Sequence, residues 1–536
     1  MSALINPAPG APPIASVETH AEVLNREFRR NMGQISRQSI AFFVGTLFTL
    51  GAGYLVKIYV ARVLGAEQLG LYALGMTLAS LVQLIGIIGL HSTAARYVAV
   101  YSATGKFDQL RGFLTRSVGI VVVLNLVFSI GLLFAGGWVA RGLYHAPGLA
   151  QYIPYFATLA FLGSINVFYC QVLGGFKDVA KRTIITNFVG SSLVIALTVL
   201  FLAMGTGMRG YLAAQIINSV VVVALLLLVA RRLTPPSARF SWAALPPMDP
   251  EIKAFAAAAF GMSALDFLVS QADKILLGFY LNPALVGIYV LASTLTAFIP
   301  IILQSVNQIF APIIAHLHAQ SRQEILQRLF QTLTKWVLAL TLPLAFVVIV
   351  FALPLMRIFG PGFEAGWPVL VIGAVGQVVN CGVGSVGYLL LMSGNQRRLI
   401  RVQFVMAGVS ILVNVILIPV LGIVGAAVAA AGVNVASNVW NLYQVRKALQ
   451  IFPYNRSYYA LLLPAVLSAG AVTLLRLYTP WIGYPWVSVV LALILAYVVF
   501  GAVAIAFALD PDDRLIAESA WSYLRGGMQK VGVNVG

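Results

Sequence analysis

The segment KIYVARVLGAEQLGLYALGMTL at residues 57–78 lies without gaps on KILLGFYLNPALVGIYVLASTL at residues 274–295 when Lys57 is placed on Lys274. Eight of the 22 positions are identical, among them the lysine that opens each segment and a Gly-x-Tyr further along. A second, shorter similarity aligns GMRG at 207–210 with GIVG at 422–425. The sequence therefore predicts an internal repeat that places corresponding helices in two halves of the chain.

The composition around this repeat is that of an integral membrane protein. Of the 536 residues, 60% are hydrophobic and only 9% are charged, whereas soluble domains carry about 25% charged residues. The mean hydropathy is +0.92. Continuous apolar runs favour helices over a barrel, whose strands alternate in polarity. We predict an all-α polytopic membrane protein with 14 transmembrane helices, at residues 39–62, 68–95, 113–135, 150–173, 183–204, 209–230, 254–281, 284–311, 333–354, 366–392, 400–420, 423–445, 457–478 and 484–509.

Basic residues alternate between the two sides of this predicted bundle. Of 34 Lys and Arg residues, 27 lie in the termini and the even-numbered connections, and the opposite side holds only Arg62, Arg141, Arg209, Arg357 and Arg476. Cytoplasmic loops collect Lys and Arg, so the net charge of +18 is read as a topology signal and not as a nucleic-acid-binding surface. We expect both termini to be cytoplasmic. The segment 1–38 contains no apolar signal-peptide core, so the first span is expected to direct insertion.

The long loop 231–253 contains five prolines and is predicted to be a cytoplasmic linker between two lobes. Because six helices separate the repeated segments, both copies have the same membrane orientation, as in a parallel repeat about an axis along the membrane normal. The predicted organisation is a cytoplasmic N-terminal segment (1–38), an N-lobe of helices 1 to 6 (39–230), the linker, a C-lobe of helices 7 to 12 (254–445), two further helices (457–509) and a cytoplasmic tail (510–536). The tail has the pattern of a short amphipathic helix.

Two lobes of this kind enclose a cavity that opens alternately to each side of the membrane, which is the architecture of a transporter. The stretches ARVLGAEQLGLYAL at 61–74 and DKILLGFYLNPALVGIYVLASTL at 273–295, with the sixth-helix Gly-x-x-Gly, resemble the polysaccharide-transporter branch of the multidrug/oligosaccharidyl-lipid/polysaccharide exporter superfamily. Its members include the Wzx-type O-antigen and exopolysaccharide flippases. The resemblance covers helices 1 to 12. It implies movement of a polyprenyl-diphosphate-linked oligosaccharide from the cytoplasmic to the periplasmic leaflet, and leaves open whether a polysaccharide polymerase is a partner.

Two acidic residues lie inside the predicted spans, Asp266 and Asp273 of helix 7, and with Ser263 and Ser270 they share one helix face. A charge at the bilayer centre costs about 2.5 to 3.5 kcal/mol on insertion scales, so such residues are functional candidates. We predict that Asp266, Asp273 and Ser270 couple transport to H⁺ or Na⁺. For Asp273, a structural ion pair with Lys274 is an equal alternative.

The lysines of the repeat, Lys57 and Lys274, are expected with Arg62 to make the outer half of the cavity positive and to attract a diphosphate. Snorkelling to the outer membrane surface is an equal alternative for both lysines. Helix 1 carries Thr46, Thr49, Gly53 and Lys57 on one face, so helices 1 and 7 are predicted to face one cavity. Glutamines in helices 2 and 8 are candidates for binding sugar hydroxyls, although hydrogen bonding between helices is their commoner use. The candidate substrate-binding residues are Lys57, Arg62, Lys274, Gln83, Gln304 and Gln308.

The sequence shows no catalytic constellation, no glycine-rich phosphate loop after a strand and no metal-ligand spacing, so neither an enzyme nor a metal site is expected. Cys170 and Cys381 lie in apolar runs and are predicted to be packed thiols. Two transporter alternatives remain open: an ion-coupled multidrug exporter and a lipid II flippase. A membrane-embedded glycosyltransferase or ligase is disfavoured, because the longest outer loop, 136–149, has only about 14 residues where such enzymes need a large catalytic loop.

Overall fold

The computed structural model describes residues 20–239, 248–478 and 485–507, and it describes the side chains of Thr49 and of the residues from Gly51 onward in these ranges, except Pro485 and Phe507. This part of the chain is built of helices and contains no β-strand. The predicted C-terminal tail and the middle of the linker, 240–247, lie outside the described residues. The all-α class predicted from the sequence is confirmed.

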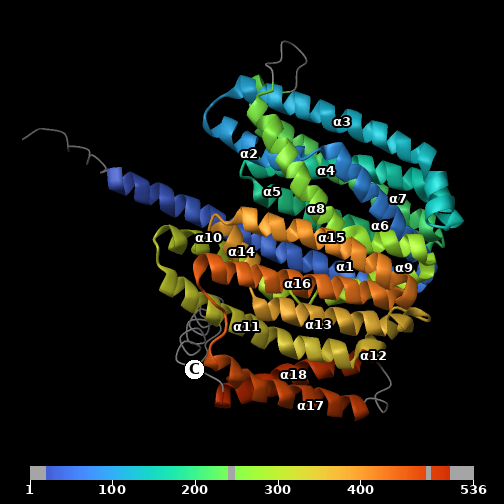
Figure 1. Cartoon of the computed structure of the whole chain (residues 1–536). Helices are drawn as coiled ribbons and strands as arrows, with labels where there is room; N and C mark the ends of the chain where they lie inside the picture. The colour runs from blue at the N-terminus through green and yellow to red at the C-terminus, as the bar shows by residue number, and fades with distance from the viewer. Residues whose placement is uncertain (1–19, 240–247, 479–484, 508–536) are drawn as a thin grey trace, which may run out of the picture.

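The N-lobe contains α1 to α7; in Figure 1, α2 to α7 lie in the upper part and α1 runs across the middle of the bundle. Its helices are α1 (His20–Ile87), α2 (Leu90–Ala103), α3 (Phe107–Trp138), α4 (Ile153–Gly175), α5 (Val179–Thr183), α6 (Ser191–Ala203) and α7 (Gly207–Leu233). Short π- and 3₁₀-helical turns lie between them at η1 (Val139–Leu143), η2 (Pro147–Tyr152) and η3 (Ile184–Gly190), and η4 (Pro236–Ala238) follows α7. The π-helical η3 joins α5 to α6, so the three together form one span, Val179–Ala203.

The C-lobe contains α8 to α16. Its helices are α8 (Pro250–Tyr280), α9 (Pro283–Thr296), α10 (Ile301–Ala319), α11 (Gln323–Val350), α12 (Ala352–Arg357), α13 (Trp367–Val383, after the 3₁₀ turn η5, Phe363–Gly366), α14 (Val386–Met392), α15 (Gln396–Leu421) and α16 (Ile423–Leu449). After η6 (Arg456–Leu461), the appended helices α17 (Leu462–Tyr478) and α18 (Pro485–Phe507) pack on α11, beneath the C-lobe in Figure 1. Tyr497 of α18 donates a hydrogen bond to the Leu340 carbonyl of α11 at 2.8 Å.

Local sequence chemistry explains where the repeated helices begin. Asp249 and Asn282 cap α8 and α9, accepting hydrogen bonds from the backbone amides of Glu251 and Leu285, and a proline occupies the first helical position in both. Such a polar cap followed by proline satisfies the free amides of a first turn and fixes its φ. In the N-lobe the corresponding break inside α1 falls at Gly65, whose φ of 76° is open to glycine.

Four predicted spans are wrong as continuous helices: 333–354 is interrupted at Phe351, 366–392 is interrupted at Gly384, and two others break more sharply. Span 68–95 breaks at Ile88 and Gly89, which have φ values of 44° and 70°, so the chain restarts as α2. Span 284–311 is interrupted before Pro300, and α9 and α10 meet at an angle of 52°. The residue before a proline disfavours the helical conformation, which accounts for the break in span 284–311.

The number of spans is smaller when it is judged from helix length and composition. Among the described residues, 12 helices are long and apolar enough to cross a membrane, or 13 if α9 and α10 form one bent span. The first of these, Gly51–Ile87, contains the break at Gly65. The predicted count of 14 is not confirmed, and it requires that the two arms of α1 each cross the membrane.

The two lobes meet through a contact that follows the internal repeat. A Cβ on Gly70 would lie 1.6 Å from the Pro283 carbonyl oxygen, and a Cβ on Gly287 would lie 2.1 Å from the Ala66 carbonyl oxygen. The alignment that places Lys57 on Lys274 also places Gly70 on Gly287 and Ala66 on Pro283. Each repeat therefore uses the equivalent glycine to approach the equivalent backbone position of the other repeat. Two parallel repeats related by a two-fold axis are expected to make such a reciprocal contact.

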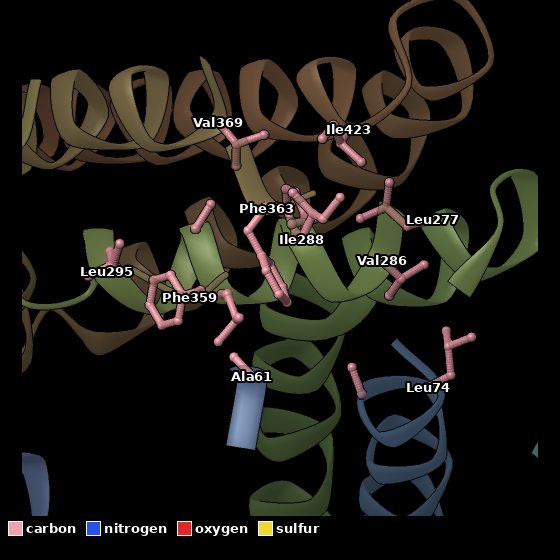
Figure 2. Packing of buried hydrophobic residues seen from close by; sticks show 14 of the residues in the cluster. Ala61, Leu74, Leu277, Val286, Ile288, Leu295, Phe359, Phe363, Val369 and Ile423 are labelled. Atoms are coloured by element: carbon pink, nitrogen blue, oxygen red, sulfur yellow. The ribbon is translucent and has the colours of Figure 1, made fainter. Parts of the chain in front are cut away.

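This contact lies at the end of the bundle where α1 breaks at Gly65, which is called the outer end because the charge pattern predicts that it faces the periplasm. Figure 2 shows Ala61 and Leu74 of α1 beside Val286, Phe359 and Leu277 of the C-lobe, all in one buried cluster. Tyr54 of α1 adds an edge contact to the Phe359 ring, with centroids 6.0 Å apart. Apolar packing thus joins the two lobes at the outer end.

Candidate substrate and ion sites

A cavity of about 440 Å³ inside the C-lobe holds Asp266 and Asp273 of α8. Its walls come from α8, α9, the start of α10, α13, α15 and α16. Its lining includes the polar residues Asp266, Asp273, Tyr289, Ser293, Thr296, Gln304, Gln377, Asn380, Gln403, Ser410, Asn414, Asn434 and Ser437. Every lining residue belongs to the C-lobe, whereas the sequence predicted a cavity shared by both lobes. The difference arises because α8 packs along α15 and turns its acidic face toward the C-lobe.

Asp266 lies in this cavity without a hydrogen bond or ion pair to any side chain or backbone group that the structure describes. Asp273 also lines the cavity, seven residues or about two helical turns further along α8. Ser263 and Ser270 do not line it, and the Ser270 hydroxyl instead donates to the Phe267 carbonyl at 3.4 Å. The predicted stripe of two acids and two serines is therefore reduced to the two acids at the cavity wall.

Asp273 is held by groups that the sequence did not single out. The hydroxyl of Tyr289, which is 2% exposed, donates to Asp273 Oδ2 at 2.6 Å, and the Lys274 backbone amide donates to Oδ1 at 2.8 Å. The predicted ion pair with the Lys274 side chain is wrong in this structure. The ammonium of Lys274 donates to Gln271 Oε1 at 2.8 Å and to the Ser270 carbonyl at 3.4 Å.

Lys274 therefore points back along α8, away from the outer end, as side chains on a helix lean toward its N-terminus. It does not snorkel outward. Lys57 of α1 lies close enough for its charge to be repelled by that of Lys274. The two lysines that the repeat makes equivalent thus come from opposite lobes and lie within range of each other's charge, which makes them a candidate site for an anion.

Arg62 has a different position from the one expected. Its Nε donates to the carbonyl oxygen of Ile358, in the connection after α12, at 2.8 Å. Arg62 thus ties α1 to the C-lobe at the outer end, and its guanidinium is committed in part to that contact.

The three predicted glutamines are dispersed. Gln304 lines the C-lobe cavity, whereas Gln308, one turn further along α10, is exposed and is not among the lining residues. The side-chain amide of Gln83 packs against Gly163 of α4, inside the N-lobe. Of the predicted helix 1 stripe, Thr49 is also internal to the N-lobe, because its hydroxyl hydrogen-bonds the Asn187 carbonyl at 3.3 Å.

Most of the polar lining of the cavity was missed by sequence reasoning. It consists of amides and hydroxyls on α13, α15 and α16, where Asn380 donates to Gln377 Oε1 at 3.0 Å and Asn414 donates to the Ser410 carbonyl at 2.8 Å. The signal was present, since each pair is three or four residues apart and shares a helix face within an apolar run. Together with two carboxylates, these groups offer the oxygen ligands that a hard cation prefers.

The opposite end of the bundle, called the inner end, has its own contact between the lobes. Arg96 lies 3.6 Å from a carboxylate oxygen of Glu251 and stacks over the Phe255 ring at 4.8 Å, while the Tyr97 hydroxyl donates to Glu251 at 3.2 Å. These residues join α2 to the first turns of α8. Within the described residues, no group of three or more His, Cys, Asp and Glu side chains is placed to hold a metal ion.

Two repeated lobes of membrane-crossing helices, joined at both ends and with a polar cavity inside the C-lobe, have the architecture of a multi-pass membrane transporter. Comparison with known sequences gives its family: residues 35–318 match the polysaccharide biosynthesis protein family, and the chain belongs to it. This match confirms, at the level of the family, the resemblance that the sequence showed to polysaccharide transporters.

Two relatives and two solved structures illustrate the similarity. The probable flippase AglR of Haloferax volcanii is 23% identical over 512 residues, which cover 91% of this chain and 100% of that protein. Stage V sporulation protein B of Bacillus subtilis is 27% identical over 178 residues, 31% of this chain and 34% of that one. The lipid II flippase MurJ in an inward closed conformation superposes with a TM-score of 0.69 at 14% identity, over 87% of this chain and 98% of that chain. An inward-facing multidrug resistance MATE transporter gives 0.65 at 16% identity, over 78% and 98%. At these identities the two structures share the fold.

Proposed function

We propose that this protein is a flippase for a polyprenyl-diphosphate-linked oligosaccharide, which it moves from the cytoplasmic to the periplasmic leaflet of a bacterial inner membrane for surface polysaccharide biosynthesis. Both termini are cytoplasmic in this proposal. The observation that carries it is the match to the polysaccharide biosynthesis family on a two-lobe transporter fold. The full-length similarity to a probable flippase supports the same function.

Lys57 and Lys274 supply the proposed recognition of the diphosphate. Lys57 and Lys274 come from opposite lobes, so an anion between them contacts both at once and relieves their mutual repulsion. Neither an apolar lipid tail nor a cationic drug gains from this pair. The glycan is proposed to occupy the space between the lobes, with Gln304 of the C-lobe cavity contributing to its hydroxyls.

The C-lobe cavity supplies the proposed coupling. Asp266 lies in it unpartnered by the described residues, and the surrounding amides and hydroxyls accept or donate hydrogen bonds. A carboxylate of this kind binds H⁺ or Na⁺ when the surroundings dehydrate and releases it when water returns, so a cation gradient drives the change between conformations. Asp273, fixed by Tyr289, is proposed to shape the same site.

Purified protein in liposomes tests the proposed function. A lipid-linked oligosaccharide with a polyprenyl diphosphate carrier is followed by the access of an impermeant lectin to its glycan. We expect protein-dependent flipping that slows at least tenfold in the Lys57→Gln/Lys274→Gln double variant, because two charge-assisted contacts are lost. The matched control, Lys106→Gln/Lys177→Gln, removes two lysines from loops at the inner end and leaves the rate unchanged.

The same liposomes separate the alternative functions. Export of a cationic dye without movement of the lipid-linked glycan identifies an ion-coupled multidrug exporter and refutes the proposal. Movement of lipid II in preference to the oligosaccharide lipid identifies a lipid II flippase. Equal rates in the lysine double variant and its control remove the two lysines from substrate recognition.

A further inference from the structure

A second cavity, of about 430 Å³, lies at the inner end of the N-lobe, on elements that the proposed transport sites do not use. Helices α3 and α7 both pack extensively on α4 but make little contact with each other. A groove therefore remains between them, with α4 as its floor. Val118 lines the α3 side, Val172 the floor and Leu227 the α7 side, so that the walls are apolar.

The connection after α7 closes the inner end of this groove. Ala238, in η4, is 0% exposed and belongs to the buried cluster that contains Leu110 and Phe113 of α3. Because η4 is anchored on α3 in this way, the chain folds back across the groove. Arg231, in the last turn of α7, and Arg239, just after η4, then both line the cavity.

Two guanidinium groups thus lie at the inner end of a cavity whose other lining residues are apolar apart from Tyr169 and Thr234. Among the described side chains, neither Arg231 nor Arg239 forms an ion pair with a carboxylate. The segment 240–247 contains no acidic residue. A cation at the C-terminus of a helix is favoured by the helix dipole, which accounts for Arg231 without a ligand. Arg239 lies beyond the end of α7, where only the general preference of cytoplasmic loops for Lys and Arg applies.

We propose that this cavity binds an anionic phospholipid of the inner leaflet, with its phosphodiester between Arg231 and Arg239 and an acyl chain along Val118 and Leu227. Arginine binds phosphate oxygens through paired N–H donors, and basic pockets between transmembrane helices on the cytoplasmic side suit anionic headgroups. Exposed aliphatic side chains lie further along α3, such as Val123 at 58% exposure, so the surface of this helix beyond the groove is apolar.

A soluble phosphate ion satisfies the arginines but leaves the apolar walls empty, and the proposal therefore commits to a lipid. No residue of the C-lobe lines the groove, which separates this site from the proposed transport pathway. A lipid held there bridges α7 and the start of the linker across to α3. Its binding stabilises the folded-back position of η4.

Native mass spectrometry of the full-length protein, titrated with dioleoyl-phosphatidylglycerol or dioleoyl-phosphatidylcholine, tests the site. We expect Arg239→Gln to weaken the tightest phosphatidylglycerol binding at least about tenfold, the loss for one charge-assisted contact. The control Arg232→Gln removes the same charge from the neighbouring position, which does not line the cavity, and is expected to lose no more than about fivefold. Equal losses in the two variants, or equal affinity for both lipids, would overturn the proposal.

A second variant distinguishes a lipid from free phosphate. Val118→Phe fills the apolar part of the groove and keeps both arginines, so it is expected to abolish the tight phosphatidylglycerol site, while millimolar inorganic phosphate does not displace the lipid from the parent protein. Unchanged lipid binding in Val118→Phe, or displacement by phosphate, contradicts a lipid site. Val118→Leu, with a smaller addition, gives a graded loss and covers the case in which the phenylalanine variant does not fold.

Discussion

Replacing Gly287 by alanine is expected to push the two lobes apart at the outer end. The new Cβ would lie 2.1 Å from the Ala66 carbonyl oxygen, where ordinary contacts begin at 3.4 Å, so α9 and α1 must separate until that distance is restored. The atoms that the new Cβ would meet belong to the backbone, so no side chain can rotate to relieve the clash. Gly70→Ala meets the Pro283 carbonyl in the same manner and is expected to act in the same direction.

The magnitude follows from the cost of overpacking. Inserting atoms into a packed contact costs about 1 to 3 kcal/mol. Because the strain exists only in the conformation closed at the outer end, the equilibrium shifts away from that conformation by about 5- to 150-fold. The intrinsic preference of alanine for helix adds a stabilisation of up to about 1 kcal/mol in either conformation and does not change the ratio.

Spin labels report the result most directly. Cysteines at Gln151 in the N-lobe and Ala365 in the C-lobe are exposed near the outer end, and the buried native cysteines are first replaced. Distances between the labels are expected to lengthen in Gly287→Ala. The control is Gly261→Ala in α8, where a Cβ meets nothing within 4 Å. A distance distribution identical in Gly287→Ala and Gly261→Ala would show that this contact does not hold the outer end closed.

Three further outcomes are expected. A single cysteine at His145 should react with an impermeant thiol reagent added outside intact cells and one at Gln396 should not, and the reverse pattern contradicts the predicted topology. Asp266→Asn should abolish the response of transport to imposed H⁺ and Na⁺ gradients, while Ser263→Ala, on the same helix but outside the cavity, should retain it; a fully responsive Asp266→Asn variant excludes this carboxyl as the coupling group. Tyr289→Phe should lower the stability by about 1.5 to 3 kcal/mol, because a buried hydrogen bond to a carboxylate is lost, and an unchanged thermal unfolding midpoint would show that the bond contributes nothing.

The repeat was the most informative feature of the sequence, because identity at a fixed shift predicts which residues symmetry brings together. Gly70 and Gly287 are such a pair, and each makes the close approach that glycine alone allows. Lys57 and Lys274 are another pair, and they lie within range of each other's charge. Neither contact could have been obtained from hydropathy, which identifies spans but not their faces.

Neither the repeat nor hydropathy could predict the helix bends or the residues that form the cavity wall. An apolar run of suitable length is the same whether the helix is straight or bent, so the breaks at Gly89 and before Pro300 were read as continuous. The wall formed by α13, α15 and α16 requires knowing how α8 is rotated against α15, which depends on tertiary packing. The direction of Lys274 was missed for a similar reason, since Gln271 competes for its ammonium one turn away.

The symmetry that joins the outer end also sets a condition on what the protein carries. Two equivalent helices that close on a two-fold axis bring like charge to like charge, so the closed outer end holds Lys57 near Lys274 at an electrostatic cost. An anion between them removes that cost only while the lobes stay close. Separating the lobes at the outer end removes one of its two partners, and its affinity falls. Under the proposed function, a diphosphate therefore stabilises the conformation that is closed to the outside and is bound less tightly once that side opens, which is the difference in affinity that release into the outer leaflet requires.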